Sequence, residues 1–169
     1  MKQTTRLIGP LLIVFGLACA PPEELQPVRD TAADEEALRT MIARYAASSS
    51  VEDLDAIMDL YATDIVQMPP NAPAITGKQA LRDSFQVFLE QNSGELKANV
   101  QDIRVSGDLA YVRVSYEQSV TPTDGGETVD EVGKWVLICQ REAGGDWNIV
   151  SEIWNGDHPP DESESPSEN

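Results

Sequence analysis

Few side chains in this sequence are suited to nucleophilic or metal chemistry. The chain contains two cysteines, Cys19 and Cys139, and one histidine, His158. Cys139 lies in the apolar run WVLIC, which is typical of a small buried residue rather than of an activated thiol. His158 stands in a polar stretch with only scattered carboxylates near it, which is not the ligand set of a metal site. The sequence therefore predicts no catalytic thiol, no bound metal and no cofactor.

A carboxylate near the C-terminus is a better candidate for acid and base chemistry. Side chains alternate between the two faces of a strand, so Glu152 would share one face of the last expected strand with Val150 and Trp154. Ile149 and Ile153 would lie on the other face. If apolar groups enclose the face of Glu152, desolvation raises the pKa of its carboxyl group toward the range of a general base.

The first 18 residues have the pattern of an export signal. Lys2 and Arg6 precede an apolar run over residues 7–17, and small residues follow it. This run is too short to be an ordinary membrane-spanning helix. We therefore expect a protein that is exported to the bacterial cell envelope.

Two kinds of processing are compatible with Cys19. Residues 16–19, GLAC, resemble a bacterial lipobox, after which Cys19 becomes the lipidated first residue of the mature chain. Residues 18–20, ACA, also fit ordinary signal cleavage, which removes Cys19 and leaves a periplasmic or secreted soluble protein. We favour the lipid anchor, because the exported chain otherwise has only one cysteine.

Composition separates one domain from two flanking segments. Residues 19–33 are rich in proline and acidic side chains and predict a flexible tether, while residues 157–169 predict a disordered acidic tail. The domain between them covers residues 34–156. The formal net charge of −17 is typical of a soluble surface and repels phosphate backbones, so we expect no binding to nucleic acid.

The first half of the domain has the hydrophobic spacing of three amphipathic helices. A helix over residues 34–49 and a second one capped by Asp53 each carry apolar residues at positions i, i+3, i+4 and i+7. A third helix follows Gly77 and would end at a glycine stop over residues 92–94. The residues expected on the buried faces are Leu38, Met41, Ile42 and Tyr45, then Leu54, Ile57, Met58 and Tyr61, then Leu81, Phe85, Phe88 and Leu89.

The second half of the domain changes to the alternation of β-strands. Residues 96–106, 109–120, 128–141 and 146–154 predict four strands joined by turns that contain glycine. A shorter strand over residues 64–68 precedes a rigid loop rich in proline. Helices followed by an antiparallel meander indicate the α+β class.

Several short motifs, in their order and spacing, are similar to those of one superfamily. They are ARY at residues 43–45, DLDAIMDLYATD at 53–64, a proline loop closed by ITG at 75–77, and DWNIVSEIW at 146–154. Residues 34–155 thereby resemble the nuclear transport factor 2-like superfamily, in its SnoaL-like and ketosteroid-isomerase-like branch.

The resemblance implies a fold and an assembly. The fold would be a cone, in which three N-terminal helices pack on a strongly curved antiparallel sheet around an apolar pocket. The assembly would be a homodimer through the outer face of the sheet, where Val136 and Ile138 would join Ile149 and Ile153.

The resemblance also places the catalytic groups of ketosteroid isomerases on this chain. Those enzymes use an Asp base, and a Tyr with a protonated Asp holds the enolate. Tyr45 matches the Tyr, whereas Met68 stands at the position of the base and Leu137 near that of the second Asp. Since methionine cannot accept a proton, steroid isomerisation by that mechanism is not expected.

Three functions follow as hypotheses. The favoured one is an exported, lipid-anchored module that binds a small hydrophobic or amphipathic ligand in the cone. An alternative is a SnoaL-type isomerase, cyclase or lyase that acts on a small carbonyl compound. A dimeric scaffold whose pocket is filled by its own side chains is the third, and a cavity well under about 300 Å³ would favour it.

Six residues carry these hypotheses. In the enzyme, Glu152 would be the base and Tyr45 a hydrogen-bond donor to the carbonyl or enolate. In the binding module, the expected ligand-contacting side chains are Tyr61, Met68, Trp135 and Trp154.

Overall fold

Three helices and six strands make up residues 31–157, the part of the chain that the computed structural model describes. The export signal, Cys19 and His158 lie outside these residues. The elements are α1 (Thr31–Ser50), α2 (Leu54–Met58), β1 (Tyr61–Met68), β2 (Ile75–Thr76), α3 (Lys78–Gln91), β3 (Asn92–Ser106), β4 (Leu109–Pro122), β5 (Val129–Arg141) and β6 (Trp147–Gly156). None of these three helices is long and apolar enough to cross a membrane.

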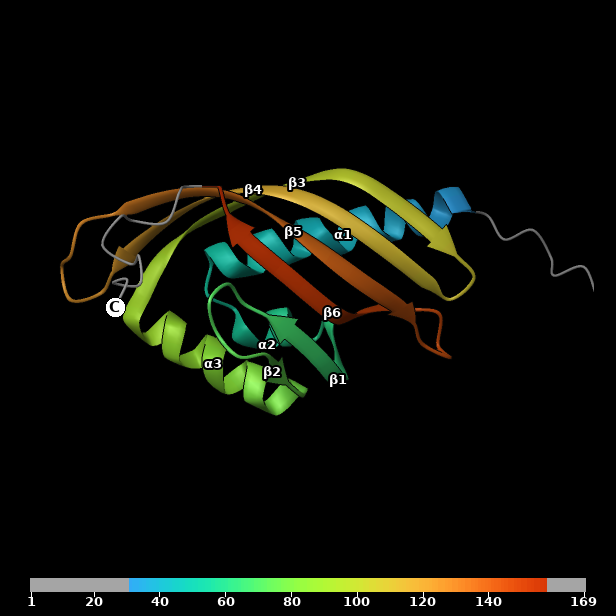
Figure 1. The fold of residues 1–169 in the computed structure, drawn as a ribbon, viewed down its shortest axis with the longest axis horizontal. Helices are drawn as coiled ribbons and strands as arrows, with labels where there is room; N and C mark the ends of the chain where they lie inside the picture. The colour runs from blue at the N-terminus through green and yellow to red at the C-terminus, as the bar shows by residue number, and fades with distance from the viewer. Residues whose placement is uncertain (1–30, 158–169) are drawn as a thin grey trace, which may run out of the picture.

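The six strands form one sheet in the order β2-β1-β6-β5-β4-β3. Neighbouring strands are antiparallel except β1 and β6, which pair in parallel. The long strands β3, β4 and β5 arch over the helices, and Figure 1 shows all three helices on the concave side of the sheet. The expected α+β cone is confirmed, with one parallel pair in a sheet that was expected to be wholly antiparallel.

The helices differ from the expected ones at their ends. Helix α1 begins at Thr31, so the last residues of the expected tether are helical. Asp53 caps α2 as predicted, and its side chain accepts a hydrogen bond of 3.0 Å from the backbone N–H of Ala56. However, α2 ends at Met58, and Tyr61, which was expected on this helix, begins β1. Tyr61 lies seven residues after Leu54, as on the buried face of a helix. It is buried, but it belongs to a strand.

The third helix also ends differently. It passes directly into β3 at Asn92, and the predicted glycine stop is absent because Gly94 lies inside the strand. A Cβ at Gly94 would lie 1.8 Å from the carbonyl oxygen of Ser119 on β4. Only glycine permits this close approach of the two backbones.

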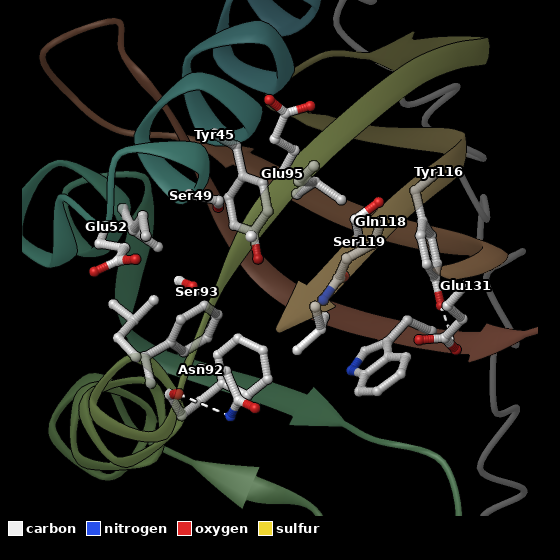
Figure 2. Close-up of a pocket in the computed structure, with 18 of the residues that line it drawn as sticks. Tyr45, Ser49, Glu52, Asn92, Ser93, Glu95, Tyr116, Gln118, Ser119 and Glu131 are labelled. Atoms are coloured by element: carbon white, nitrogen blue, oxygen red, sulfur yellow. Dashed lines mark hydrogen bonds between the residues drawn. The ribbon is translucent and has the colours of Figure 1, made fainter. Parts of the chain in front are cut away.

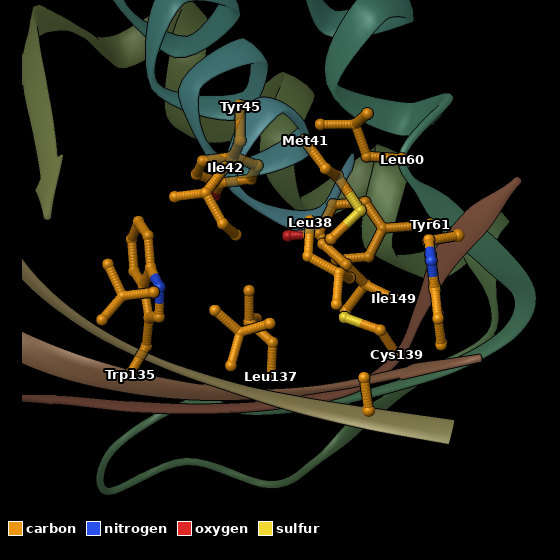
Figure 3. Close-up of a cluster of buried hydrophobic side chains, with 14 of the residues drawn as sticks. Leu38, Met41, Ile42, Tyr45, Leu60, Tyr61, Trp135, Leu137, Cys139 and Ile149 are labelled. Atoms are coloured by element: carbon orange, nitrogen blue, oxygen red, sulfur yellow. The ribbon is translucent and has the colours of Figure 1, made fainter. Parts of the chain in front are cut away.

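Helix α1 lies alongside β3 and packs its apolar face against the concave side of the sheet. Leu38 and Ile42 are fully buried as predicted, and Figure 3 shows them facing Leu137 and Cys139 of β5. Each such side chain contributes about 1.5–3 kcal/mol through burial. This core fixes the distance between α1 and the sheet.

One arginine connects the start of α1 to the C-terminal end of β5. Arg141 of β5 forms ion pairs with Asp34 of α1 and with Asp108 of the β3–β4 turn. Its guanidinium carbon lies 4.3 Å from the centre of the Trp147 ring. The side chains of Arg141 and Asp34 are only 16% and 11% exposed, so water screens their ion pair weakly.

A β-bulge at Val150 changes which side chains of β6 face inward. Ile138 of β5 pairs with Ser151, but the next residue, Cys139, pairs with Ile149, so Val150 is the additional residue. Ile149 is consequently fully buried. The prediction that Ile149 lies on the outer face of the sheet is therefore wrong.

Candidate functional site

A cavity of about 450 Å³ lies between the helices and the concave face of the sheet. Helix α3 and the strands β3 to β6 supply most of its walls, and α1, the turn after it, α2 and β1 supply the rest. Figure 2 shows Tyr45, Gln118 and Tyr116 around this space. Its apolar and aromatic lining residues are Tyr45, Ile57, Phe85, Phe88, Leu89, Leu96, Tyr116, Val120, Val129, Trp135 and Trp154.

The aromatic side chains form one continuous wall around Trp135. The ring of Tyr45 meets the indole edge-on, with centroids 5.4 Å apart and an interplanar angle of 79°. The ring of Tyr116 stacks on the same indole, with centroids 5.4 Å apart and an angle of 22°. Among the described residues, Nε1 of Trp135 is buried without a hydrogen-bond partner.

Glu152 is the buried carboxylate of the cavity and is only 3% exposed. The hydroxyl of Tyr61 donates a hydrogen bond of 2.7 Å to its Oε2, and Nε2 of Gln67 donates one of 3.3 Å to the same oxygen. Burial raises the pKa of the Glu152 carboxyl group, and these two donors oppose part of that rise. Glu152 can therefore take up and release a proton closer to neutral pH than an exposed glutamate can.

The bulge at Val150 and the parallel β1–β6 pair bring this network together. Beyond the bulge, Glu152 and Trp154 share the inner face of β6, as predicted, and Ile153 lies on the outer face. In the pairing of β1 with β6, Gln67 lies opposite Glu152. The amide of Gln67 thereby reaches the carboxylate across two neighbouring strands.

The two tyrosines near Glu152 stay protonated. Burial raises the pKa of Tyr61 and of Tyr45 well above the ordinary value for tyrosine, and the negative charge of Glu152 raises both further. Their rings lie 6.3 Å apart at an angle of 76°. Of the two, Tyr61 makes the direct hydrogen bond to Glu152.

A second carboxylate lies at the other end of the aromatic wall. The hydroxyl of Tyr116 donates a hydrogen bond of 3.1 Å to Oε1 of Glu131, which Figure 2 marks with a dashed line. Burial, and then the charge of Glu131, raise the pKa of Tyr116. A Cβ on Gly133 would lie 2.4 Å from the Tyr116 ring, so glycine leaves space for this tyrosine.

The structure brings together four of the six predicted site residues as cavity lining: Tyr45, Trp135, Glu152 and Trp154. Tyr61 is buried and does not line the cavity, but its hydroxyl donates a hydrogen bond to Glu152, which does. Met68 does not line it either, because strand alternation turns Gln67 inward and Met68 away. A glutamine amide is no general base, so this end of β1 still lacks a proton acceptor.

Two other expectations concern residues away from the cavity lining. Leu137, near the position of the second Asp in the isomerases, is part of the apolar core. Cys139 is fully buried, and burial raises the pKa of its thiol to about 12, which keeps it unreactive. Within residues 31–157, no three His, Cys, Asp or Glu side chains are grouped so that they could hold a metal ion.

Gln67 and Glu131 are two of the polar cavity residues that the sequence reasoning missed. Gln67 was hidden because its neighbour Met68 aligned with the isomerase base. Glu131 follows the turn after β4 and has no apolar alternation around it. Gly133, two residues later, was a signal for this region, since a glycine inside a strand often marks a place where another group approaches the backbone closely.

The family model of the SnoaL-like domain matches residues 38–151. The chain belongs to this family. The matched residues therefore include Tyr45 on α1 and end in β6, at the residue before Glu152. Comparison with curated proteins finds no significant match.

Solved structures share this fold at low sequence identity. A ketosteroid isomerase-like protein from Erwinia carotovora atroseptica is 21% identical, with a TM-score of 0.68 over 73% of this chain and 96% of its own. A nuclear transport factor 2-like superfamily protein from Salmonella enterica is 15% identical, with a TM-score of 0.68 over 80% and 99%. A protein from Catenulispora acidiphila, in complex with S-DNPA, is 16% identical, with a TM-score of 0.64 over 75% and 95%. These likenesses show that the SnoaL-like domain shares the fold of these three proteins.

Proposed function

We propose that this SnoaL-like domain binds a small hydrophobic or amphipathic molecule in its cone without chemical turnover. The observation that carries the proposal is the cavity of about 450 Å³, because ligand sites are concave, mostly apolar and about 300–1,000 Å³ in volume. Aromatic side chains form much of its wall. A space of this size also argues against a scaffold filled by its own side chains.

The proposal includes the localisation of the protein. We infer that residues 1–18 direct export and that Cys19 carries the lipid that holds the domain at the cell envelope. Mass spectrometry of the mature amino terminus tests this directly. A diacylated Cys19 is the expected result, whereas a free amino terminus at Pro21 would rule out the anchor.

Binding inside the cone is tested by filling it. Gln118 lines the cavity, and the adjacent Glu117 is exposed on β4, so replacing each by tryptophan adds the same bulk inside or outside. With the uncharged dye Nile red as probe, Gln118→Trp is expected to weaken binding at least about tenfold and Glu117→Trp less than about twofold. Equal effects of the two variants, or no binding by the unmodified protein, would contradict the proposal.

A second candidate is acid and base catalysis on a small carbonyl compound, and Glu152 is the observation that favours it. A buried carboxylate with a raised pKa beside an apolar cavity is suited to remove a proton from carbon. Tyr45 would then donate to the carbonyl oxygen, with Tyr61 holding the carboxylate in place.

Proton exchange separates an enzyme from a binding module. Small ketones in D₂O would be followed by NMR for deuterium uptake next to the carbonyl, with the unmodified protein and with Glu152→Gln. The binding module is expected to give the rate of buffer alone in both samples. Uptake that depends on Glu152 would instead establish the enzyme.

A further inference from the structure

Carboxylates are the only charged groups among the described residues that line the cavity. No lysine, arginine or histidine is among them. A cavity with negative groups in low-dielectric walls concentrates positive ions. The four glutamates of its lining are Glu52, Glu95, Glu131 and Glu152.

Glu152 has no counter-charge within the part of the chain that the structure describes. It is 3% exposed, and its two hydrogen-bond donors, Tyr61 and Gln67, are both neutral. Of the ion pairs among residues 31–157, none includes Glu152. A buried carboxylate is costly to ionise unless a positive group lies beside it. The open space next to Glu152 is where such a group would be bound.

The aromatic wall is suited to the same kind of ligand. Trp135 lies between Tyr45 and Tyr116, and Trp154 pairs with it across β5 and β6. Aromatic faces attract cations, tryptophan most strongly, and they also pack against the apolar part of a ligand. Figure 3 shows Tyr45 and Trp135 on opposite elements, one on α1 and one on β5.

We propose that the cavity selects a hydrophobic organic cation, whose ammonium group lies beside Glu152 and whose apolar part lies along Trp135 and Trp154. This inference rests on the proposed ligand-binding function and names the chemical class of the ligand. Glu131, half-buried at the other end of the aromatic wall, adds to the negative potential without being the main counter-charge.

The test compares two probes of the same shape and different charge. Benzyltrimethylammonium is a cation, and neopentylbenzene is its uncharged carbon analogue. Binding of each to the purified protein is followed by the fluorescence of its tryptophans, two of which line the cavity. The cation is expected to bind at least about tenfold more tightly, which is a free-energy difference in the range of a desolvated cation–π contact with an ion pair.

Matched variants locate the charge that is responsible. Glu152→Gln is expected to lower the affinity for benzyltrimethylammonium about tenfold and to leave that for neopentylbenzene within about twofold. Glu117→Gln removes the same charge from an exposed site on β4 and is expected to change neither affinity. Equal losses in both variants would show that only the net charge of the molecule matters, which would overturn the proposal.

The unmodified protein alone distinguishes the remaining outcomes. If neopentylbenzene binds as tightly as the cation or more tightly, the preference for cations is wrong and the ligand-binding function stands. If neither probe binds, both proposals fail. The ratio of the two affinities therefore decides the question even where Glu152→Gln does not fold, which circular dichroism would show.

Discussion

At the scale of single residues, Glu152 is the group on which the chemistry of the cavity depends. Its carboxylate is buried, it receives hydrogen bonds from Tyr61 and Gln67, and no positive side chain among residues 31–157 pairs with it. The neighbouring Tyr45, Tyr61 and Cys139 all have pKa values raised by burial, so they do not titrate near neutral pH. A change in protonation near Glu152 can thus be attributed to Glu152.

This gives a pH dependence of stability with a definite sign. The pKa of Glu152 is raised in the folded protein, so between its ordinary value of 4.5 and the raised value the folded state binds more protons than the unfolded state. The free energy of unfolding contributed by this group therefore falls as pH rises through that window and is constant above it.

The comparison of the unmodified protein with Glu152→Gln isolates this term. Urea unfolding at a series of pH values is expected to show Glu152→Gln gaining stability relative to the unmodified protein as pH rises above 4.5. A constant difference between the two proteins across this range would mean that Glu152 has the same pKa in both states.

At the scale of elements, the sequence predicted the buried face of α1 better than the inward-facing residues of β6. The apolar spacing of Leu38 and Ile42 identified the buried face of α1, because a helix carries its periodicity in consecutive residues. The bulge at Val150 has no such local pattern, since one additional residue in β6 is visible only against its partner in β5. Ile149 was therefore assigned to the wrong face.

The candidate site was predictable within one strand but not across strands. Glu152 and Trp154 follow the bulge, and their shared face needed only the alternation of one strand. The contacts of Glu152 with Tyr61 and Gln67 join residues 91 and 85 positions apart, through the parallel β1–β6 pair. Alternation within one strand does not specify the register of such a pair, so neither donor could be assigned from the sequence.

The ion pair of Arg141 gives a prediction for the junction of α1 with the sheet. Arg141→Met would leave the buried Asp34 without its positive partner and remove the contact with Trp147. We expect a loss of about 3 kcal/mol in the free energy of unfolding, measured by urea denaturation.

The matched control is an exposed pair between α1 and the residue that follows α2. Arg44 lies 3.4 Å from Asp59, and the two side chains are 51% and 68% exposed. Arg44→Met should cost less than about 1 kcal/mol, because solvent screens such pairs. Similar losses in the two variants would show that the Arg141 pair is no better shielded than a surface pair.

At the scale of the whole molecule, the sheet has a second face that is partly apolar. Ile138 and Ile153 of β5 and β6 are 37% and 49% exposed on the side away from the helices. Val136 is half-buried on the same side. We propose that two copies of the domain cover this face in a homodimer, as the resemblance implies, although Ile149 takes no part in it.

Sedimentation equilibrium tests the dimer. The unmodified protein is expected to have twice the mass of one chain, and Ile153→Glu the mass of a single chain, because a charge cannot be buried there without a partner. Asp130→Lys changes an exposed charge elsewhere on β5 and is expected to leave the dimer intact. If the unmodified protein has the mass of one chain, the proposed homodimer is wrong.

The central claim is that the cone encloses a space that a small molecule occupies. A high-resolution crystal structure of the protein, purified from the cells that produce it, tests this claim most directly. The account predicts electron density for a bound molecule against Trp135, with a positive group beside Glu152. Density for water alone, or side chains that close the space, would contradict it.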